Sequence, residues 1–392
     1  MRLEWNTRAL GDIVSLIIDY RGKTPKKLGG DWSESGGYRA LSAKNIKTGN
    51  IVQLESIRYL SADMYKKWMK DEIQHGDILI TSEAPFGELL YWDSDEKIVL
   101  SQRLFALRCK PQIYPRYIYY FMTSRAFQGE LRNRATGTTV TGLRQPELLK
   151  CNIVVPDLST QQAIAEALSA LDAKIANNKA INHHLEQIAQ AIFKSWFVEN
   201  VPDNWEYTNL GCITTEIRTK AKEQRLTVLS AVKTGNLIPS EDYFTKQVYS
   251  KDTSKYIVVE PNDFAYNPAR VNIGSIGMND FSFTGCVSPV YIVFRAESEY
   301  HHFLNFFIKS PIFQEEVRVR ASGSVRQSLS YKDFSLIQVL YPSLEIVRKF
   351  NVQYENIFTS INQLNIENDR LTTLRDTLLP RLMSGELSVS DI

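Results

Sequence analysis

The residues best suited to bind a ligand lie in two short loops of matching composition. Residues 132–145 read RNRATGTTVTGLRQ, and residues 318–330 read RVRASGSVRQSLS. Glycine lets a backbone approach a surface, short hydroxyls and backbone amides bind phosphate, and Arg and Gln fork onto the edges of DNA bases. The competing interpretation is a pair of solvated turns with ordinary Thr and Gly chemistry. We predict DNA contacts from Arg134, Thr138, Thr139, Thr141, Arg144, Arg320, Ser324, Arg326, Gln327 and Ser328.

Basic and amide side chains elsewhere in the chain extend this set of candidate DNA contacts. A basic loop at residues 21–27 suits an arm that contacts phosphate, and a solvated charge run explains it equally well. A Lys-Thr-Gly-Asn turn occurs twice, and the segment around residue 268 diverges most between the two copies, where a difference in specificity is expected. The candidates from these segments are Arg21, Lys23, Asn45, Lys47, Lys233, Asn267 and Arg270.

The sequence signatures of catalysis that we tested are incomplete. Gly22-Lys23-Thr24 resembles the end of a phosphate-binding loop, but the Gly required five residues earlier is replaced by Ile17. Asn267-Pro268-Ala269 lacks the second Pro and the aromatic residue of an adenine-methyltransferase motif. The histidines at 183–184 and 301–302 are adjacent pairs, whose side chains diverge on a helix. We predict no catalytic residue and no metal site in this chain.

The composition is that of a cytoplasmic protein with several domains and unevenly placed charge. A chain of 392 residues, of which 43% are hydrophobic, can form two or three domains with substantial cores. Four scattered cysteines without a C-x-x-C pair favour a reducing compartment, and we expect no signal peptide and no membrane span. The net charge is +2, yet residues 1–158 hold 23 Lys and Arg against 18 Asp and Glu. Nucleic-acid contact is permitted by this distribution without being required.

A long predicted helix, Ser159 to Phe197, must position these segments. It contains no Pro or Gly, and its apolar residues recur at spacings of three and four, as in a coiled-coil seam. The seam reappears when 186 is added to each residue number, except that Arg375 interrupts it, where the neighbouring Leu374 can take its place. Asn182 and Asn368 (368 − 182 = 186) are equivalent seam positions. A buried Asn fixes helix register, and a seam that opens to solvent there fits equally well.

The same offset in residue number also relates much of the remaining sequence, which indicates a tandem duplication. Arg-Ala-Thr-Gly at 134–137, for example, reappears as Arg-Ala-Ser-Gly at 320–323. Short apolar runs predict strands at 77–81, 98–100, 103–109, 151–155, 255–260, 290–295 and 336–341. Each copy is therefore predicted to be an α+β domain followed by one long helix. The predicted boundaries are 1–158, 159–200, 201–342 and 343–392.

The duplication and two motifs resemble the specificity subunit (S subunit) of type I restriction-modification systems over essentially the full length. The segment AQAIFKSWFV at 189–198 resembles the end of the first spacer helix in that family, and LLPRLMSGEL at 378–387 resembles its C-terminal signature. The resemblance implies that residues 1–158 and 201–342 are target recognition domains, each reading one half of a bipartite DNA site. It also implies that the long helices form an antiparallel coiled coil, related by an internal pseudo-twofold repeat, that spaces the two domains.

The resemblance further implies partners and cofactors. Two methyltransferase (modification) subunits are expected to dock on the coiled coil and restriction/translocase subunits to join them, so the assembled complex is expected to be enzymatic while this chain is not. No cofactor is expected here; S-adenosylmethionine, ATP and Mg are expected on the partner subunits. Recognition domains vary widely within such a family, so the DNA contacts proposed above rest on side-chain chemistry alone.

Three other interpretations are compatible with the sequence. One is the specificity subunit of a type II system with split sites, another is a coiled-coil scaffold without a DNA role, and the third is a self-contained methyltransferase or nuclease.

The predicted helix is about 58 Å long at ~1.5 Å per residue, so it could separate DNA contacts by at most ~17 base pairs, and more naturally by about one turn. Because the two domains differ in sequence, we expect an asymmetric site.

Overall fold

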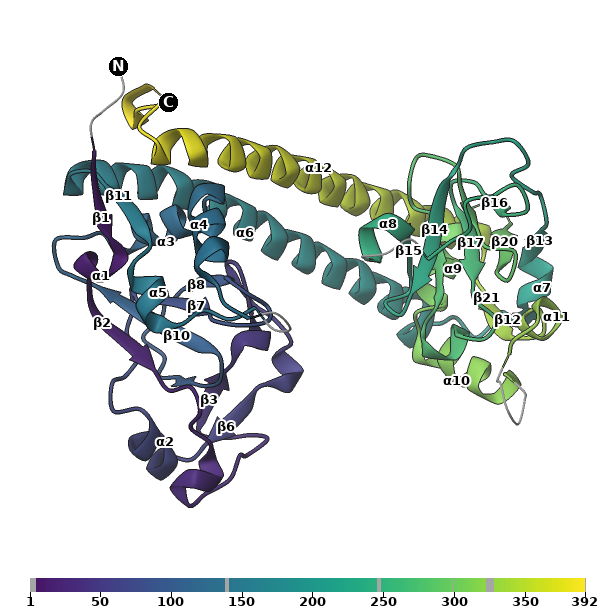
Figure 1. Ribbon diagram of the computed structural model, residues 1–392. Helices are drawn as coiled ribbons and strands as arrows, with labels where there is room; N and C mark the ends of the chain where they lie inside the picture. The colour runs from purple at the N-terminus through teal and green to yellow at the C-terminus, as the bar shows by residue number, and fades with distance from the viewer. Residues whose placement is uncertain (1–4, 138–140, 245–247, 298, 322–327, 392) are drawn as a thin grey trace. The chain divides into compact units, whose positions relative to one another are not determined.

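The computed structural model describes residues 5–137, 141–244, 248–297, 299–321 and 328–391. The chain divides into two compact units: unit 1 comprises residues 1–178 and 366–392, and unit 2 comprises residues 179–365. The two long helices, α6 (Leu158–Lys194) and α12 (Leu344–Met383), each contribute one half to either unit. Figure 1 shows α6 in teal and α12 in yellow-green. None of the described helices is long and apolar enough to cross a membrane.

Unit 1 is an α+β fold built around a four-stranded antiparallel sheet (Figure 1). Its strands are β1 Asn6–Ala9, β2 Val14–Asp19, β3 Tyr38–Leu41, β4 Ile46–Lys47, β5 Asn50–Ile51, β6 Arg58–Leu60, β7 Ile78–Thr81, β8 Leu89–Tyr91, β9 Val99–Leu100, β10 Leu104–Cys109 and β11 Asn152–Val155. Its shorter helices are α1 Leu10–Ile13, α2 Ala62–Trp68, α3 Pro115–Thr123, α4 Arg125–Arg134 and α5 Gln145–Leu149, with 3-10 turns η1 Pro25–Leu28, η2 Ala43–Asn45, η3 Leu54–Ser56 and η6 Val389–Asp391. The strand order of the central sheet is β2-β10-β7-β8.

Unit 2 has the same class of fold. Its strands are β12 Glu206–Asn209, β13 Thr214–Ile217, β14 Thr227–Val232, β15 Asn236–Pro239, β16 Ile257–Val259, β17 Asp263–Tyr266, β18 Ile276–Met278, β19 Gly285–Val287, β20 Ile292–Ala296 and β21 Gln338–Tyr341. Its shorter helices are α7 Leu210–Ile213, α8 Ser240–Tyr243, α9 His301–Phe307, α10 Pro311–Arg320 and α11 Tyr331–Phe334, with a π-helical turn η4 Ser195–Glu199 and a 3-10 turn η5 Val271–Ile273. The strand order of its central sheet is β13-β20-β17-β18.

The strand connections confirm the predicted duplication and the α+β class. The sheet β2-β10-β7-β8 of unit 1 corresponds strand for strand to β13-β20-β17-β18 of unit 2. The antiparallel pair β1-β11 corresponds to β12-β21, and the parallel pair β3-β9 corresponds to β14-β19. Each strand predicted from the sequence overlaps an observed strand. The two units therefore share their central sheet and these two strand pairs, while their remaining sheets differ: β6-β3-β9 and β4-β5 in unit 1, and β15-β14-β19-β16 in unit 2.

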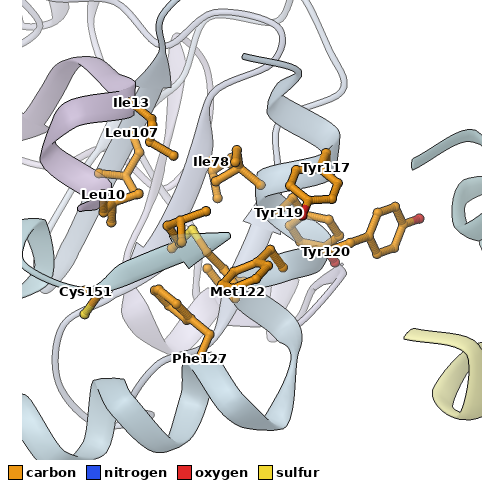
Figure 2. Packing of buried hydrophobic residues seen from close by; sticks show 14 of the residues in the cluster. Leu10, Ile13, Ile78, Leu107, Tyr117, Tyr119, Tyr120, Met122, Phe127 and Cys151 are labelled. Carbon is orange, nitrogen blue, oxygen red and sulfur yellow. The ribbon is translucent and has the colours of Figure 1, made fainter. Parts of the chain in front are cut away.

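The central sheet of each unit is buried on both faces, which explains why its strands read as continuous apolar runs. In β10, Phe105 and Leu107 face one hydrophobic cluster, while Leu104 and Ala106 face another. In β20, Phe294 and Val293 likewise face different clusters. Figure 2 shows the first of these clusters, in which Ile78 and Leu107 of the sheet lie with Tyr117, Met122 and Phe127 of helices α3 and α4.

The long helices pair through the predicted heptad seam and run antiparallel within each unit. As the residue number increases along α6, the residue number of its contact partner in α12 decreases, so the two helices are antiparallel. The contacting pairs are Asp172–Arg375 and Asn178–Asn368 in unit 1, and Asn182–Asn365 and Phe193–Phe350 in unit 2. The seam residues Ile164, Leu168 and Ile175 are buried as predicted. A buried apolar seam is the usual source of stability for such a pair.

One detail of the seam differs from the sequence prediction. Leu374 does not take the place of Arg375: it is 46% exposed, and the Arg375 Nη1 lies 2.8 Å from Oδ1 of Asp172. The seam accepts a cation here because a carboxylate from α6 faces it. Asn182 and Asn368 are both buried, at 8% exposed; Asn182 donates to Asn365, and Asn368 accepts from Asn178.

The two motifs at the helix ends complete the cores of the two units. Phe193 and Phe197, from the end of α6 and the π-helical turn after it, lie in the aromatic core of unit 2 with Phe350. Leu382 and Met383, from the end of α12, are buried in the core of unit 1. Both motifs therefore have a packing role that explains their aromatic and aliphatic residues.

Candidate nucleic-acid interface

In both units, the loop predicted to contact DNA lies across the segment that follows one strand of the central sheet. This strand is β7 in unit 1 and β17 in unit 2. In unit 1, Leu143 N donates to Ser82 O at 2.8 Å, just beyond the end of β7. In unit 2, Leu329 N donates to Pro268 O at 3.1 Å, just beyond the end of β17. The pairs are equivalent, because 143 + 186 = 329 and 82 + 186 = 268. The same backbone contact thus places both loops.

The Lys-Thr-Gly-Asn turns lie beside the same connecting segment. In unit 1, Thr48 Oγ1 donates to Oε2 of Glu88 at 2.6 Å, in the connection from β7 to β8. In unit 2, Gly274 lies so close to Lys233 that an added Cβ would meet the Lys233 carbonyl oxygen at 2.5 Å. We call the three adjoining segments of each unit its candidate face. The described segments are 47–50, 82–88 and 136–144 without 138–140 in unit 1, and 233–236, 268–274 and 328–330 in unit 2.

The candidate face of unit 1 presents exposed polar side chains from a closed loop. Thr136 and Gly142 exchange two backbone hydrogen bonds of 2.9 Å, which close the base of the loop. Thr141 and Arg144 are exposed, and Arg144 forms no ion pair with any residue that the structure describes. A surface depression beside them is lined by Asn133, Arg134, Ala135, Thr136, Arg144, Pro146 and Glu147. Lys47, on the neighbouring turn, is also exposed.

Arg134 and Arg320, which are equivalent in the two units, are held by acids of their own helices. The Arg134 guanidinium lies 2.9 Å from Glu130 and 3.7 Å from Glu147, and hydrogen bonding to Glu130 raises the pKa of Arg134. The Arg320 guanidinium lies 2.9 Å from Glu316. These ion pairs direct each Arg along its helix end and offset part of its charge.

The candidate face of unit 2 presents a different set of side chains at the same places. Lys233, Arg270 and Ser328 are exposed. Asn267 is half-buried, and its Oδ1 accepts a hydrogen bond from Ala269 N at 3.1 Å, which orients its amide. The different residues on the two faces would present different hydrogen-bonding patterns to DNA.

Three candidates have their polar groups committed to the fold, which corrects the sequence prediction. Asn45 is 1% exposed; its Oδ1 accepts from Ser42, and its Nδ2 donates to Ser56 and to the Gln53 carbonyl. Such a residue cannot reach DNA. Lys23 Nζ donates to the Trp68 carbonyl at 2.8 Å. Arg21 forms a bidentate pair with Asp19 through Nε and Nη2, at 2.9 and 2.8 Å.

No group of three or more His, Cys, Asp or Glu side chains in the described ranges could hold a metal ion. Thr138, Thr139, Ser324, Arg326 and Gln327 lie outside the described residues.

The structure adds Arg103 to the side chains near the face of unit 1. Its φ angle is +64°, its side chain is 54% exposed, and its Nε lies 2.9 Å from Glu83, in the segment crossed by the loop. A positive φ is uncommon for Arg and could not be predicted from the sequence. The sequence signal for Arg103 was limited to its place at the start of a predicted strand.

These features define a duplicated α+β protein that presents one loop-built face per unit. Residues 2–187 match the model of the type I restriction modification DNA specificity domain. The chain is 26% identical over 350 residues to the type I restriction enzyme MjaIX specificity subunit of Methanocaldococcus jannaschii, an alignment that covers 81% of this chain and 79% of that protein. It is 24% identical over 403 residues to the HindI specificity subunit of Haemophilus influenzae, with 81% and 88% covered.

A solved structure supports the same assignment at the level of the fold. The S subunit of a type I restriction-modification system from M. genitalium aligns with a TM-score of 0.59 at 18% identity, over 97% of this chain and 96% of that one. Residues 2–187 thus match a type I DNA specificity domain, and the chain is similar, over 81% of its length, to specificity subunits of type I restriction enzymes.

Proposed function

We infer that this chain confers DNA sequence specificity on a type I restriction-modification complex, with each candidate face reading one half of a bipartite site. The observation that carries the assignment of the site is the repeated loop contact, Leu143 to Ser82 and Leu329 to Pro268. A contact kept in both copies, beneath loops that carry exposed Arg, Thr and Ser, favours a shared binding task over two unrelated turns.

The side chains proposed to contact DNA fall into two groups. Arg144, Thr141 and Lys47 serve the first half-site, and Asn267, Arg270, Lys233 and Ser328 serve the second, with Arg134 and Arg320 in supporting positions. Arg and Asn recognise guanine and adenine edges respectively when they reach the major groove, whereas Lys and hydroxyl groups contact phosphate. Because the two sets differ, the two half-sites are expected to be unrelated in sequence.

The long helices are proposed to act as the spacer between recognition domains at residues 1–158 and 201–342. The spacer segments would be 159–200 and 343–392. Support comes from the uninterrupted α6, which at 37 residues is about 55 Å long at ~1.5 Å per residue. A rigid element of that length can hold two protein domains at a fixed separation on a duplex.

We propose that two methyltransferase subunits dock on the helices and that restriction/translocase subunits complete the complex. Outward-facing apolar side chains support a docking role: Ile181, Ile188, Ile366 and Leu374 are between 38% and 52% exposed. Exposed apolar residues on an otherwise polar helix are typical of a surface that a partner covers. The partner subunits would supply S-adenosylmethionine, ATP and Mg, so the catalytic steps of the complex would take place on them.

Methylome sequencing of cells with and without this gene tests the proposal. We expect a bipartite, asymmetric methylated site that disappears with the gene. Replacing residues 1–158 by another recognition domain should then change one half-site and leave the other intact. Unchanged methylation in the deletion strain would contradict the function, and changes at both half-sites would contradict the division of labour between domains.

A further inference from the structure

In each unit, the candidate loop is anchored through a backbone carbonyl group at an equivalent position, that of Leu143 in unit 1 and that of Leu329 in unit 2. The carbonyl oxygen of Leu143 accepts a hydrogen bond from Nη1 of Arg21 at 3.3 Å. The carbonyl oxygen of Leu329 accepts one from the hydroxyl of Tyr266 at 3.2 Å. Leu143 and Leu329 are 2% and 0% exposed, so these bonds lie beneath the loops. Each unit therefore fixes its loop at both the N–H and the C=O of the same residue.

In unit 1, the anchoring guanidinium is itself held rigidly. Two of its nitrogens bind the Asp19 carboxylate, and its carbon lies 4.0 Å from the centre of the Phe105 ring. Phe105 is fully buried in the central sheet. A planar guanidinium restrained by a carboxylate and an aromatic face has little freedom, so it fixes the position of its third partner. That third partner is Leu143, the loop residue directly before Arg144.

In unit 2, a different residue type performs the same task, and it lies on strand β17 instead of in the turn after β2. Tyr266 is fully buried in β17, and its ring stacks on Phe334 with centroids 5.4 Å apart. Burial raises the pKa of the Tyr266 hydroxyl, so the group remains a hydrogen-bond donor. The equivalent position in unit 1 is Ile80 (266 − 186), which has no donor. The two copies thus reach one arrangement through unrelated side chains.

We propose that Arg21 and Tyr266 are positioning residues for sequence discrimination, each setting the geometry of one recognition loop and therefore of one half-site. The proposal rests on the proposed function and goes beyond it by assigning one loop-anchoring residue to each half-site. Arg21 was predicted from the sequence to contact phosphate, and the structure assigns it to the loop instead. Loss of an anchor would let the loop shift relative to the DNA, which blurs base contacts while leaving the exposed phosphate contacts in place.

The test uses the full chain in complex with its methyltransferase subunits and a library of randomised DNA duplexes. Wild-type complex should select a bipartite sequence. Arg21→Gln should lower base preference about tenfold in one half of that sequence and leave the other half unchanged, since one good base contact is worth roughly that factor. Tyr266→Phe should affect the opposite half. Arg21→Lys, which keeps a cationic donor group without the planar guanidinium fork, should retain part of the preference.

The controls separate positioning from other roles. Arg8→Gln and Tyr207→Phe change exposed residues outside the candidate faces and should leave both half-sites unaltered. If Arg21→Gln weakened binding to all duplexes equally and reduced the salt dependence, a phosphate contact would replace the proposal. Unchanged preferences in both variants, or equal loss in both half-sites, would also overturn it. Failure of the wild-type complex to select any bipartite sequence would refute the proposed function, and the anchors would then have no half-site to govern.

Discussion

At the scale of single residues, arginines on the candidate faces have two kinds of surroundings. Arg134 and Arg320 are paired with Glu130 and Glu316, one helical turn away. Arg144 is exposed and forms no ion pair with a described residue. A guanidinium without a protein partner has all its donors available to a DNA base or phosphate, whereas a paired one must first give up a carboxylate.

This difference predicts unequal effects of two neighbouring substitutions. Arg144→Ala should weaken binding of the assembled complex to its selected DNA by about 1–3 kcal/mol, the usual worth of a base-contacting Arg. Arg134→Ala should weaken binding less and lower thermal stability instead, because it leaves Glu130 without its pair. Fluorescence anisotropy with the selected duplex and thermal unfolding of each variant measure the two effects. Equal losses of affinity would contradict the distinction.

His302 predicts a pH dependence of the stability of unit 2. It is 7% exposed, and its ring lies 4.1 Å from that of His301 and 4.7 Å from that of Tyr354. Burial, and then the charge of His301, lower the pKa of His302 from 6.5 to about 3. Glu355 at 3.9 Å is too distant and too exposed to offset the burial. His302 therefore stays neutral in the folded state while it takes up a proton in the unfolded state below pH 6.5.

Because the unfolded state binds more protons, stability falls as the pH is lowered from about 7 toward 4. His302 should account for about 2 kcal/mol of this loss at pH 5, from a shift worth ~1.4 kcal/mol per pH unit. His302→Phe keeps an aromatic ring beside Tyr354 and should remove this part of the loss. Denaturant unfolding of both proteins at pH 7 and pH 5 gives the comparison, with the exposed His183→Gln as control. A variant that loses as much stability as the wild type would refute the role of His302.

At the scale of elements, the seam between α6 and α12 contains a buried amide pair. Asn178 is fully buried; its Nδ2 donates to Asn368 at 3.1 Å and to Glu367 at 2.7 Å, while its Oδ1 has no partner among the described residues. Polar groups in a seam cost stability and specify alignment, since a shifted register would leave them unpaired.

Replacing the amide pair should reveal both effects. Asn368→Leu alone leaves Asn178 facing an apolar side chain and should lower stability by about 1 kcal/mol. The double change of Asn178 and Asn368 to Leu should restore or exceed wild-type stability, because two apolar residues then fill the seam. Thermal unfolding of the single and double variants decides the matter. A double variant less stable than the single one would show that the amides stabilise the pair.

The elements themselves could be predicted from the sequence, whereas several side-chain partners could not. The run at 103–109 identified β10 because alternate residues meet two cores, and the constant offset in residue number located its counterpart in unit 2. The partner of Arg21, in contrast, is a carbonyl 122 residues away, and no local pattern encodes that contact. The position of Arg375 in the seam depends likewise on a distant partner, since Asp172 lies on another helix.

At the scale of the whole molecule, the length of the helix pair is expected to set the spacing of the half-sites. Removing one seven-residue repeat from each helix, at the paired positions around Asn182 and Asn365, shortens each helix by about 10 Å. The spacer in the selected DNA should then shorten by about three base pairs, at ~3.4 Å each. Methylome sequencing or selection from randomised duplexes would report the spacer. Altered half-sites with an unchanged spacer would contradict a role of the helices in spacing.

The composition of unit 1 from two distant stretches of chain has a consequence for its synthesis. Residues 1–178 leave the ribosome early, but Leu382 and Met383, which fill the same core as Leu10 and Ile13, follow only after all of unit 2. Domains generally fold as they emerge, so unit 2 has its complete stretch of chain before unit 1 does. The first unit to be translated is therefore the last to be finished, and a nascent chain arrested after unit 2 would carry an open core in unit 1.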